Sequence, residues 1–309
     1  YLANACKICA ASYNVLATRV EEQAKKTTDA KAKAALEERA LAARNRGLEF
    51  YIQLLDLVPK QPIQTYRYVV YHLERRRHEP KSADYRKIVE LVNKAIGLYG
   101  GTKAAASDLM GLKASLGAAL CRLEKYRDAI VVLESLNKPL EEAFQKRMAT
   151  YRKQRALSEQ YPDRYLRPKL PVRRALHLEV RRWLARAYLL GMARSKYPVA
   201  TQICAEDLRL YDSSKADYWD LLYWLCESLR RQGQFEQVIR FVSRPVMASG
   251  GKMGDGVVRE GSKGTSRDFR DLLLKVRRDI AALTDAKRKN QLAPFVEQYL
   301  KQLVGARSR

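Results

Sequence analysis

The stretch LGAALCRLEKYRDAIVVLESL, residues 116–136, decides the fold class of this chain. Apolar and small residues recur in it at helical spacing on both sides of a short break, at Leu116, Gly117, Leu120, Tyr126, Ala129 and Leu133. A small residue in a first helix lets a second helix approach closely, and an aromatic residue at the start of the second helix fills the space beside the turn. The stretch therefore predicts an antiparallel pair of helices, each burying one face.

The same pattern returns further along the chain. Leu225 is followed at offsets of one, four, ten, thirteen and seventeen by Cys226, Leu229, Phe235, Val238 and Val242, which are the offsets of the first stretch. A third copy has three extra residues in its turn and contains Leu184, Ala185, Tyr188, Tyr197, Ala200 and Cys204. A poorer fourth copy, with a longer insertion, contains Val69, Val70, Leu73, Tyr85 and Ile88. Because each pair buries only one face by itself, such pairs stack on one another.

Two of these segments, LEKYRDAI (123–130) and RQGQFEQVI (231–239), resemble the tetratricopeptide repeat family. The resemblance is clearest over 112–137 and 221–243 and weaker over 181–210 and 66–95. It implies a concave groove, lined by the first helix of each pair, that holds peptides or protein segments.

The repeats are irregular, however. The aromatic anchors are 41, 71 and 38 residues apart, at Tyr85, Tyr126, Tyr197 and Phe235, whereas regular arrays repeat every ~34 residues. The proline that usually ends a repeat is also missing. An irregular helical bundle with chance matches is therefore the alternative to a stack of repeats.

We expect an all-α protein, in which stacked antiparallel hairpins form an irregular α-solenoid with little or no sheet. The expected parts are an N-terminal hairpin (1–58), degenerate helix pairs (63–139), a helix with a basic, proline-punctuated linker (140–171), further helix pairs (172–248), a flexible Gly-rich loop (249–266) and C-terminal helices (267–309). Thr27-Thr28-Asp29 is expected to break the first hairpin, and Pro139 to end a helix.

The charge of the chain is strongly positive. Its 309 residues include 59 Lys or Arg and 34 Asp or Glu, which gives a net charge of +25. Such a surface attracts nucleic acid, anionic lipid or acidic proteins, unless the charge serves only solubility. The longest uncharged stretch, 8–18, is too short to span a bilayer.

Arginines gather on one side of the predicted first helices. The positions that share this side include Arg67, Tyr71, Arg75, Arg122, Arg182, Arg186, Tyr223, Arg230 and Arg231. Because guanidinium groups bind carboxylates and phosphates with two parallel hydrogen bonds, we expect a groove for an acidic protein or peptide segment. The alternative is that these arginines are merely solvated.

A second basic region offers a nucleic-acid alternative. Residues 146–182 contain 12 Lys or Arg, interleaved with tyrosines. The candidate residues are Arg152, Lys153, Arg155, Arg164, Arg167, Lys169, Arg173 and Arg174. Basic and aromatic residues together can hold single-stranded RNA by charge and stacking. No helix-turn-helix or zinc-finger spacing accompanies them, so this signal is electrostatic only.

No motif predicts catalysis. Cys6 and Cys9 form half of a zinc motif without a second half, and the segment from Gly256 to Lys263 has the lysine of a phosphate-binding loop one position out of place.

Five cysteines, at Cys6, Cys9, Cys121, Cys204 and Cys226, favour buried free thiols and a reducing compartment, the cytoplasm. Since residue 1 is not Met, a removed leader stays open. We expect a non-catalytic scaffold with no cofactor and no metal, which could be a subunit of a larger assembly. A nucleic-acid-associated protein is the second hypothesis, and an enzyme is the third.

Overall fold

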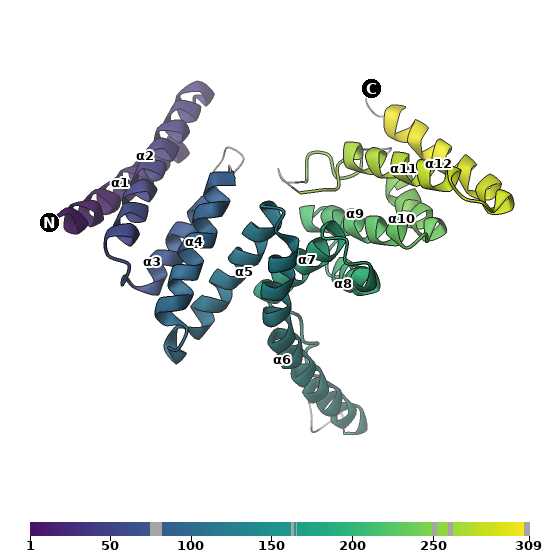
Figure 1. Cartoon of the computed structure of the whole chain (residues 1–309), viewed down its shortest axis with the longest axis horizontal. Coiled ribbons are helices and arrows are strands. Elements are labelled where there is room, and N and C mark those ends of the chain that lie inside the picture. Colours follow the sequence, from purple (N-terminus) through teal and green to yellow (C-terminus); the bar gives the residue numbers. More distant parts are fainter. Residues whose placement is uncertain (75–81, 162–163, 165, 249–251, 259–261, 306–309) are drawn as a thin grey trace. The chain divides into compact units, whose positions relative to one another are not determined.

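The computed structural model describes residues 1–74, 82–161, 164, 166–248, 252–258 and 262–305 (Figure 1). Over these residues it contains twelve α-helices and no strand, so the predicted all-α class is confirmed. The helices are α1 (Leu2–Lys26), α2 (Ala30–Leu57), α3 (Ile63–Glu74), α4 (Ser82–Tyr99), α5 (Ala106–Arg122), α6 (Tyr126–Gln160), α7 (Ala175–Leu190), α8 (Tyr197–Leu208), α9 (Ala216–Arg231), α10 (Phe235–Ala248), α11 (Ser266–Ala281) and α12 (Ala286–Gly305). Short 3₁₀ turns, Lys103–Ala105 and Arg194–Lys196, precede α5 and α8. The chain divides into two compact units, Tyr1–Ala119 and Leu120–Arg309.

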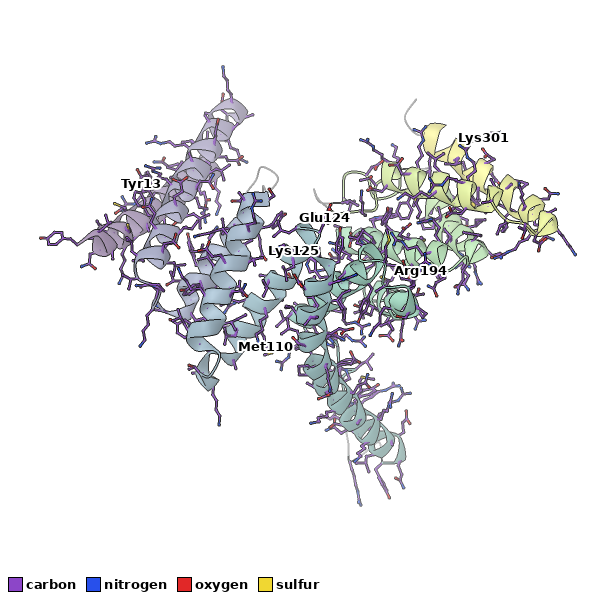
Figure 2. All side chains as sticks on the ribbon, viewed as in Figure 1. Tyr13, Met110, Glu124, Lys125, Arg194 and Lys301 are labelled. Atoms are coloured by element: carbon purple, nitrogen blue, oxygen red, sulfur yellow. The ribbon has the colours of Figure 1, made fainter. Side chains whose placement is uncertain are left out.

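The first unit begins with the expected hairpin. Helices α1 and α2 lie side by side, with Tyr13 on α1 (Figure 2). Asp29 caps α2, because its carboxylate accepts a hydrogen bond of 2.7 Å from the backbone N–H of Ala32. Gly47 permits the close approach of the two helices, since a Cβ atom there would lie 3.3 Å from the carbonyl oxygen of Ala10.

Helices α3 and α4 form the next pair. Their buried residues lie at the expected helical spacing, at Ile63, Tyr66, Val70 and Leu73 on α3 and at Ile88, Leu91, Val92 and Ala95 on α4. The hydroxyl of the buried Tyr66 donates a hydrogen bond of 2.8 Å to the carbonyl of Pro59, which ties α3 to the turn before it. Residues 75–81, which follow α3 within the predicted helix pairs of 63–139, lie outside the described residues.

The predicted stop at Pro139 is wrong. Helix α6 runs without interruption for 35 residues, and Pro139 lies inside it. A proline inside a helix removes one hydrogen bond and costs about 3 kcal/mol. Burial of Leu136 and Phe144 on the flanking turns offsets this cost. The turn before α6 contains Glu124, whose φ of 59° is left-handed, and Lys125, whose N–H donates to the carbonyl of Leu120 (Figure 2).

In the second unit, α7 packs on α8, α8 on α9 and α9 on α10. All six residues of the repeated pattern in α9 and α10 are buried, at Leu225, Cys226, Leu229, Phe235, Val238 and Val242. Helices α11 and α12 pack on each other and contact α9 and α10, respectively. No helix over the described residues combines the length and apolarity needed to cross a membrane.

Part of the Gly-rich segment, which is expected to be a flexible loop, packs against α9. Its described parts, 252–258 and 262–265, fold over Trp219 of α9, and Met253 forms a bridge with Thr265. The backbone N–H of Lys263 donates to the buried carboxylate of Asp220. Thr265 and Asp268 then form a capping box that starts α11. A Cβ atom at Gly254 or Gly264 would lie within 2.7 Å of Trp219, so these two glycines permit a close approach, which composition alone does not distinguish from flexibility.

Candidate functional site

Four of the seven arginines predicted to line an open groove are bound to aspartates on a neighbouring helix pair. In the first unit, Arg67 of α3 lies 2.5 Å from Asp108 of α5. In the second unit, Arg182 and Arg186 of α7 pair with Asp217 and Asp220 of α9, and Arg230 of α9 pairs with Asp279 of α11. Each pair joins two helices that are not consecutive in the chain. These arginines therefore hold neighbouring hairpins together.

The ring of Trp183 contacts the guanidinium groups of two groove candidates. Those of Arg122 and Arg186 lie 5.3 and 4.5 Å from the centre of the Trp183 ring. Such contacts contribute about 0.5–1 kcal/mol each at exposed sites and more when they are desolvated. Arg186 is mostly buried and also bonded to Asp220, so it is not available to an external carboxylate.

The remaining groove candidates do not form an open surface either. Arg231 and Arg230 both bind Glu227, which is only 3% exposed. Tyr223 is buried, with its ring against Phe269 at a centroid distance of 5.9 Å. Tyr71 is half-exposed on α3, and Arg75 lies outside the described residues. The positive charges of the predicted Arg-rich groove are therefore largely neutralised by carboxylates of the same chain. These carboxylates lie mostly on neighbouring helices, so the spacing of residues along one helix does not predict them.

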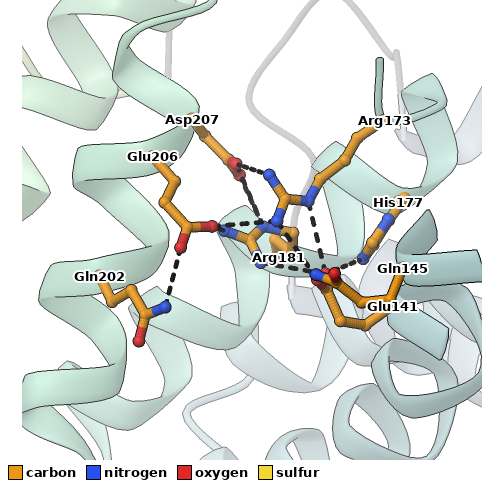
Figure 3. A network of polar contacts seen from close by, with 8 residues as sticks. All are labelled: Glu141, Gln145, Arg173, His177, Arg181, Gln202, Glu206 and Asp207. Carbon is orange, nitrogen blue, oxygen red and sulfur yellow. Dashed lines mark hydrogen bonds and ion pairs between the residues drawn. The ribbon is translucent and has the colours of Figure 1, made fainter. Parts of the chain in front are cut away.

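A buried ion-pair network lies where α6, α7 and α8 meet (Figure 3). Arg181, only 5% exposed, donates from Nε to both oxygens of Asp207 at 3.1 and 3.0 Å and from another nitrogen to Glu206 at 2.7 Å. Its remaining guanidinium nitrogen lies 3.4 Å from Glu141. We call this set the Arg181 network: Glu141, Gln145, Arg173, His177, Arg181, Gln202, Glu206 and Asp207.

Arg173 joins this network from the linker. Its guanidinium lies 3.3 Å from Glu141 and 3.0 Å from Glu206, and it stacks on Phe144 at 4.3 Å. Arg173 is one of the residues predicted for a nucleic-acid surface; in the structure its charge instead fastens the linker to α6 and α8. The sequence pattern does not predict this network, because two of its carboxylates, Glu141 and Glu206, lie 65 residues apart.

Burial and neighbouring charges shift the pKa values of several side chains in the Arg181 network. Burial opposes ionisation of Glu141 and Glu206, but hydrogen bonds from Gln145 and Gln202 and the nearby guanidinium groups outweigh it, so both pKa values are lowered. Burial lowers the pKa of His177 to about 4, although Glu141 lies 3.3 Å from its Nε2 atom. Neither ring nitrogen of His177 makes a hydrogen bond over the described residues. His177 is therefore neutral at pH 7.

The neutral His177 predicts an acid-sensitive fold. The unfolded side chain takes up a proton below its ordinary pKa of about 6.5, whereas the folded one does not until about pH 4. The free energy of unfolding should therefore fall as pH falls from 6.5 towards 4, by about 2 kcal/mol between pH 7 and 5. Urea denaturation of the wild type and His177→Gln at both pH values tests this. The variant should lose about 2 kcal/mol less, and an equal loss in both proteins would rule out His177 as the cause.

The other predicted basic residues are each exposed. The C-terminal half of α6 extends beyond α7 (Figure 1), and only Phe144 and Ser158 are buried along 141–160. Over the described residues, no ion-pair partner is found for a set of cations that we call the α6 basic surface: Lys146, Arg147, Arg152, Lys153, Arg164, Arg167, Lys169 and Arg174. Arg155 is excluded because it pairs with Glu159 at 2.7 Å.

A concavity and several aliphatic side chains accompany these cations. The concavity has a volume of about 320 Å³ and is lined by Lys146, Arg147, Thr150, Tyr151, Gln154, Lys169 and Pro171. Leu166 is 96% exposed and Leu170 is 61% exposed in the adjoining linker, with Val172 and Leu157 also exposed. An exposed surface that is both cationic and aliphatic suits a partner that is both acidic and apolar.

The cysteines are free thiols, four of them buried. Burial raises the pKa of the Cys121 thiol to about 12 and raises those of Cys204 and Cys226 further, which makes them poor nucleophiles. Cys6 lies on α1, with its sulfur 3.8 Å from the side-chain oxygen of Gln53. Among the residues that the structure describes, no group of three or more His, Cys, Asp or Glu side chains is arranged to hold a metal ion.

Comparison of the chain with protein-family models, with curated proteins and with solved structures gave no match.

Proposed function

We propose that the protein is a non-catalytic binding scaffold of tetratricopeptide-like helix pairs and that it holds an acidic segment of another protein on the α6 basic surface. The observation that carries this proposal is the distribution of ion pairs. Arginines between the first helices are committed to carboxylates of the same chain, whereas those of the α6 basic surface have no such partner over the described residues.

Exposed aliphatic residues favour a protein partner over RNA. Leu166, Leu170 and Val172 are each more than 60% exposed and lie among the cations of the linker. Aliphatic side chains bury favourably against other aliphatic side chains, whereas single-stranded nucleic acid is held by stacking on aromatic rings. A partner with alternating acidic and apolar residues satisfies both features of this surface. RNA binding through the same cations is the competing function.

Charge reversal tests the proposal. The variant Arg152→Glu/Lys153→Glu/Arg167→Glu/Lys169→Glu should weaken binding of a labelled peptide of alternating Glu and Leu by about 10–100-fold, because each exposed ion pair contributes about 0.2–1 kcal/mol and reversal adds repulsion. Fluorescence anisotropy measures the affinity. A matched variant, Lys31→Glu/Lys33→Glu, changes two exposed lysines on α2 and should leave the affinity unchanged.

Oligouridine serves as the competing ligand. If the protein is a peptide scaffold, the Glu-Leu peptide should bind more tightly than an RNA of equal charge and lose less affinity as salt is added. The nucleic-acid function would be favoured instead if RNA bound more tightly than the peptide. The logarithm of its binding constant should then fall steeply with the logarithm of the salt concentration, as expected for contacts with several phosphates.

A further inference from the structure

A second concavity, distinct from the α6 basic surface, lies beside α9 and α10. Its volume is about 1050 Å³, comparable to that of pockets that enclose drug-sized ligands. We call it the α9–α10 pocket; its lining consists of Leu208, Ser213, Tyr218, Trp219, Leu222, Gln237, Arg240, Phe241, Arg244, Pro245, Ala248 and Met253. Eight of these twelve side chains are apolar or aromatic, and none is a carboxylate.

The apolar wall of the pocket is rigidly held. The indole N–H of Trp219 donates to the carbonyl of Ser213 at 2.7 Å, and the ring packs edge-on against Phe269. The Gly-rich segment covers Trp219 from the other side and brings Met253, 5% exposed, into the lining. A wall fixed by a hydrogen bond, a ring contact and a close-packed segment is preorganised, so a ligand need not pay for ordering it.

The charged part of the lining comes from one stripe of α10. Gln237, Arg240 and Arg244 follow at intervals of three and four, so they lie on one face of the helix. Both arginines are exposed, and neither has an ion-pair partner over the described residues. This distinguishes them from Arg182, Arg186 and Arg230, whose charges are neutralised within the chain.

We propose that the α9–α10 pocket binds a small amphipathic anion, a molecule with an apolar body and a carboxylate or phosphate head group. The body lies against Trp219, Leu222 and Phe241, and the head group accepts hydrogen bonds from Arg240 and Arg244. Guanidinium pairs bind such head groups with charge-assisted hydrogen bonds. A small molecule fits better than an extended segment, because α9, α10, the 208–213 turn and Met253 all border the pocket.

Two dyes that differ by one sulfonate group test this site. Anilinonaphthalene sulfonate is the anionic probe, and N-phenyl-1-naphthylamine is its uncharged counterpart. The wild-type protein should bind the anionic dye saturably. The variant Arg240→Gln/Arg244→Gln should lose at least about tenfold of that affinity, since two charge-assisted hydrogen bonds disappear, and should keep its affinity for the uncharged dye. Ala248→Trp, at an exposed position of the lining, should weaken both dyes by filling the pocket.

A control variant and a competition complete the experiment. Lys31→Gln/Lys33→Gln removes two exposed charges from α2 and should change neither affinity, with circular dichroism verifying that each variant folds. Displacement of the anionic dye by dodecanoate or by dodecyl phosphate supports the proposal and identifies the head group. Displacement by neither, or by the Glu-Leu peptide alone, overturns it, as does an equal loss of affinity in the α2 control.

Discussion

Replacing Arg181 with methionine is expected to lower the free energy of unfolding by about 3–5 kcal/mol. The side chain of Asp207 is 1% exposed and receives both hydrogen bonds from Nε of Arg181. Without them, its charge stays buried, and Arg173, at 3.7 Å, is the one cation left within ion-pair distance among the described residues. Breaking a buried pair from one side is costly because the remaining charge has lost its hydration without compensation.

Urea denaturation followed by circular dichroism measures the effect, and two comparisons make it specific. Arg155→Met removes an exposed arginine whose partner, Glu159, lies 2.7 Å away, and it should lower the free energy of unfolding far less, because solvent screens an exposed pair. The double variant Arg181→Met/Asp207→Leu should recover much of the loss, because a well-packed apolar pair replaces the charges. If Arg181→Met and Arg155→Met lowered the free energy of unfolding equally, the buried network would not contribute the expected stability.

The second large effect is expected at Gly264. Its φ of 121° disfavours any side chain, and a Cβ atom there would lie 2.6 Å from the backbone carbonyl carbon of Trp219. Backbone atoms cannot move aside as a flexible side chain can, so Gly264→Ala should lower the free energy of unfolding by about 2–4 kcal/mol. It should also weaken dye binding, because the segment that covers Trp219 is displaced from the α9–α10 pocket.

Gly256 provides the matched control for this prediction. It belongs to the same segment and has a φ of 77°, but a Cβ atom there would meet no other atom within 4 Å. Gly256→Ala should therefore cost only the backbone penalty, about 1–2 kcal/mol. If thermal unfolding followed by circular dichroism gave the same loss for both variants, the close approach to Trp219 would not be the reason for glycine at position 264.

Helical periodicity predicts most of the fold because it is a local property. The break at Asp29, the buried faces of α3 and α4 and the buried residues of α9 and α10 all follow from spacing and capping within a few residues. Pro139 shows where local rules fail. A proline predicts a helix end, but the packing of Leu136 and Phe144, which involves residues distant in the sequence, outweighs it.

The candidate site depends on pairings between distant residues and is correspondingly harder to predict. Periodicity places Arg182 and Arg186 on one side of a helix, but it does not show that Asp217 and Asp220 lie opposite them. Arg173 likewise reads as one more cation in a basic run, although it is fastened to Glu141 and Glu206. In contrast, Gln237, Arg240 and Arg244 carry a usable signal, a cationic stripe at helical spacing on a helix whose other face is apolar.

The positions of the tryptophans have a practical consequence for any unfolding experiment. Trp183, Trp219 and Trp224 are the only tryptophans of the chain, and all three belong to the second unit, Leu120–Arg309. Intrinsic indole emission therefore monitors that unit alone, whereas a helix-sensitive signal covers both. Overlaying the two melting curves would show whether residues 1–119 unfold together with the remainder or in a separate step, without any label being attached.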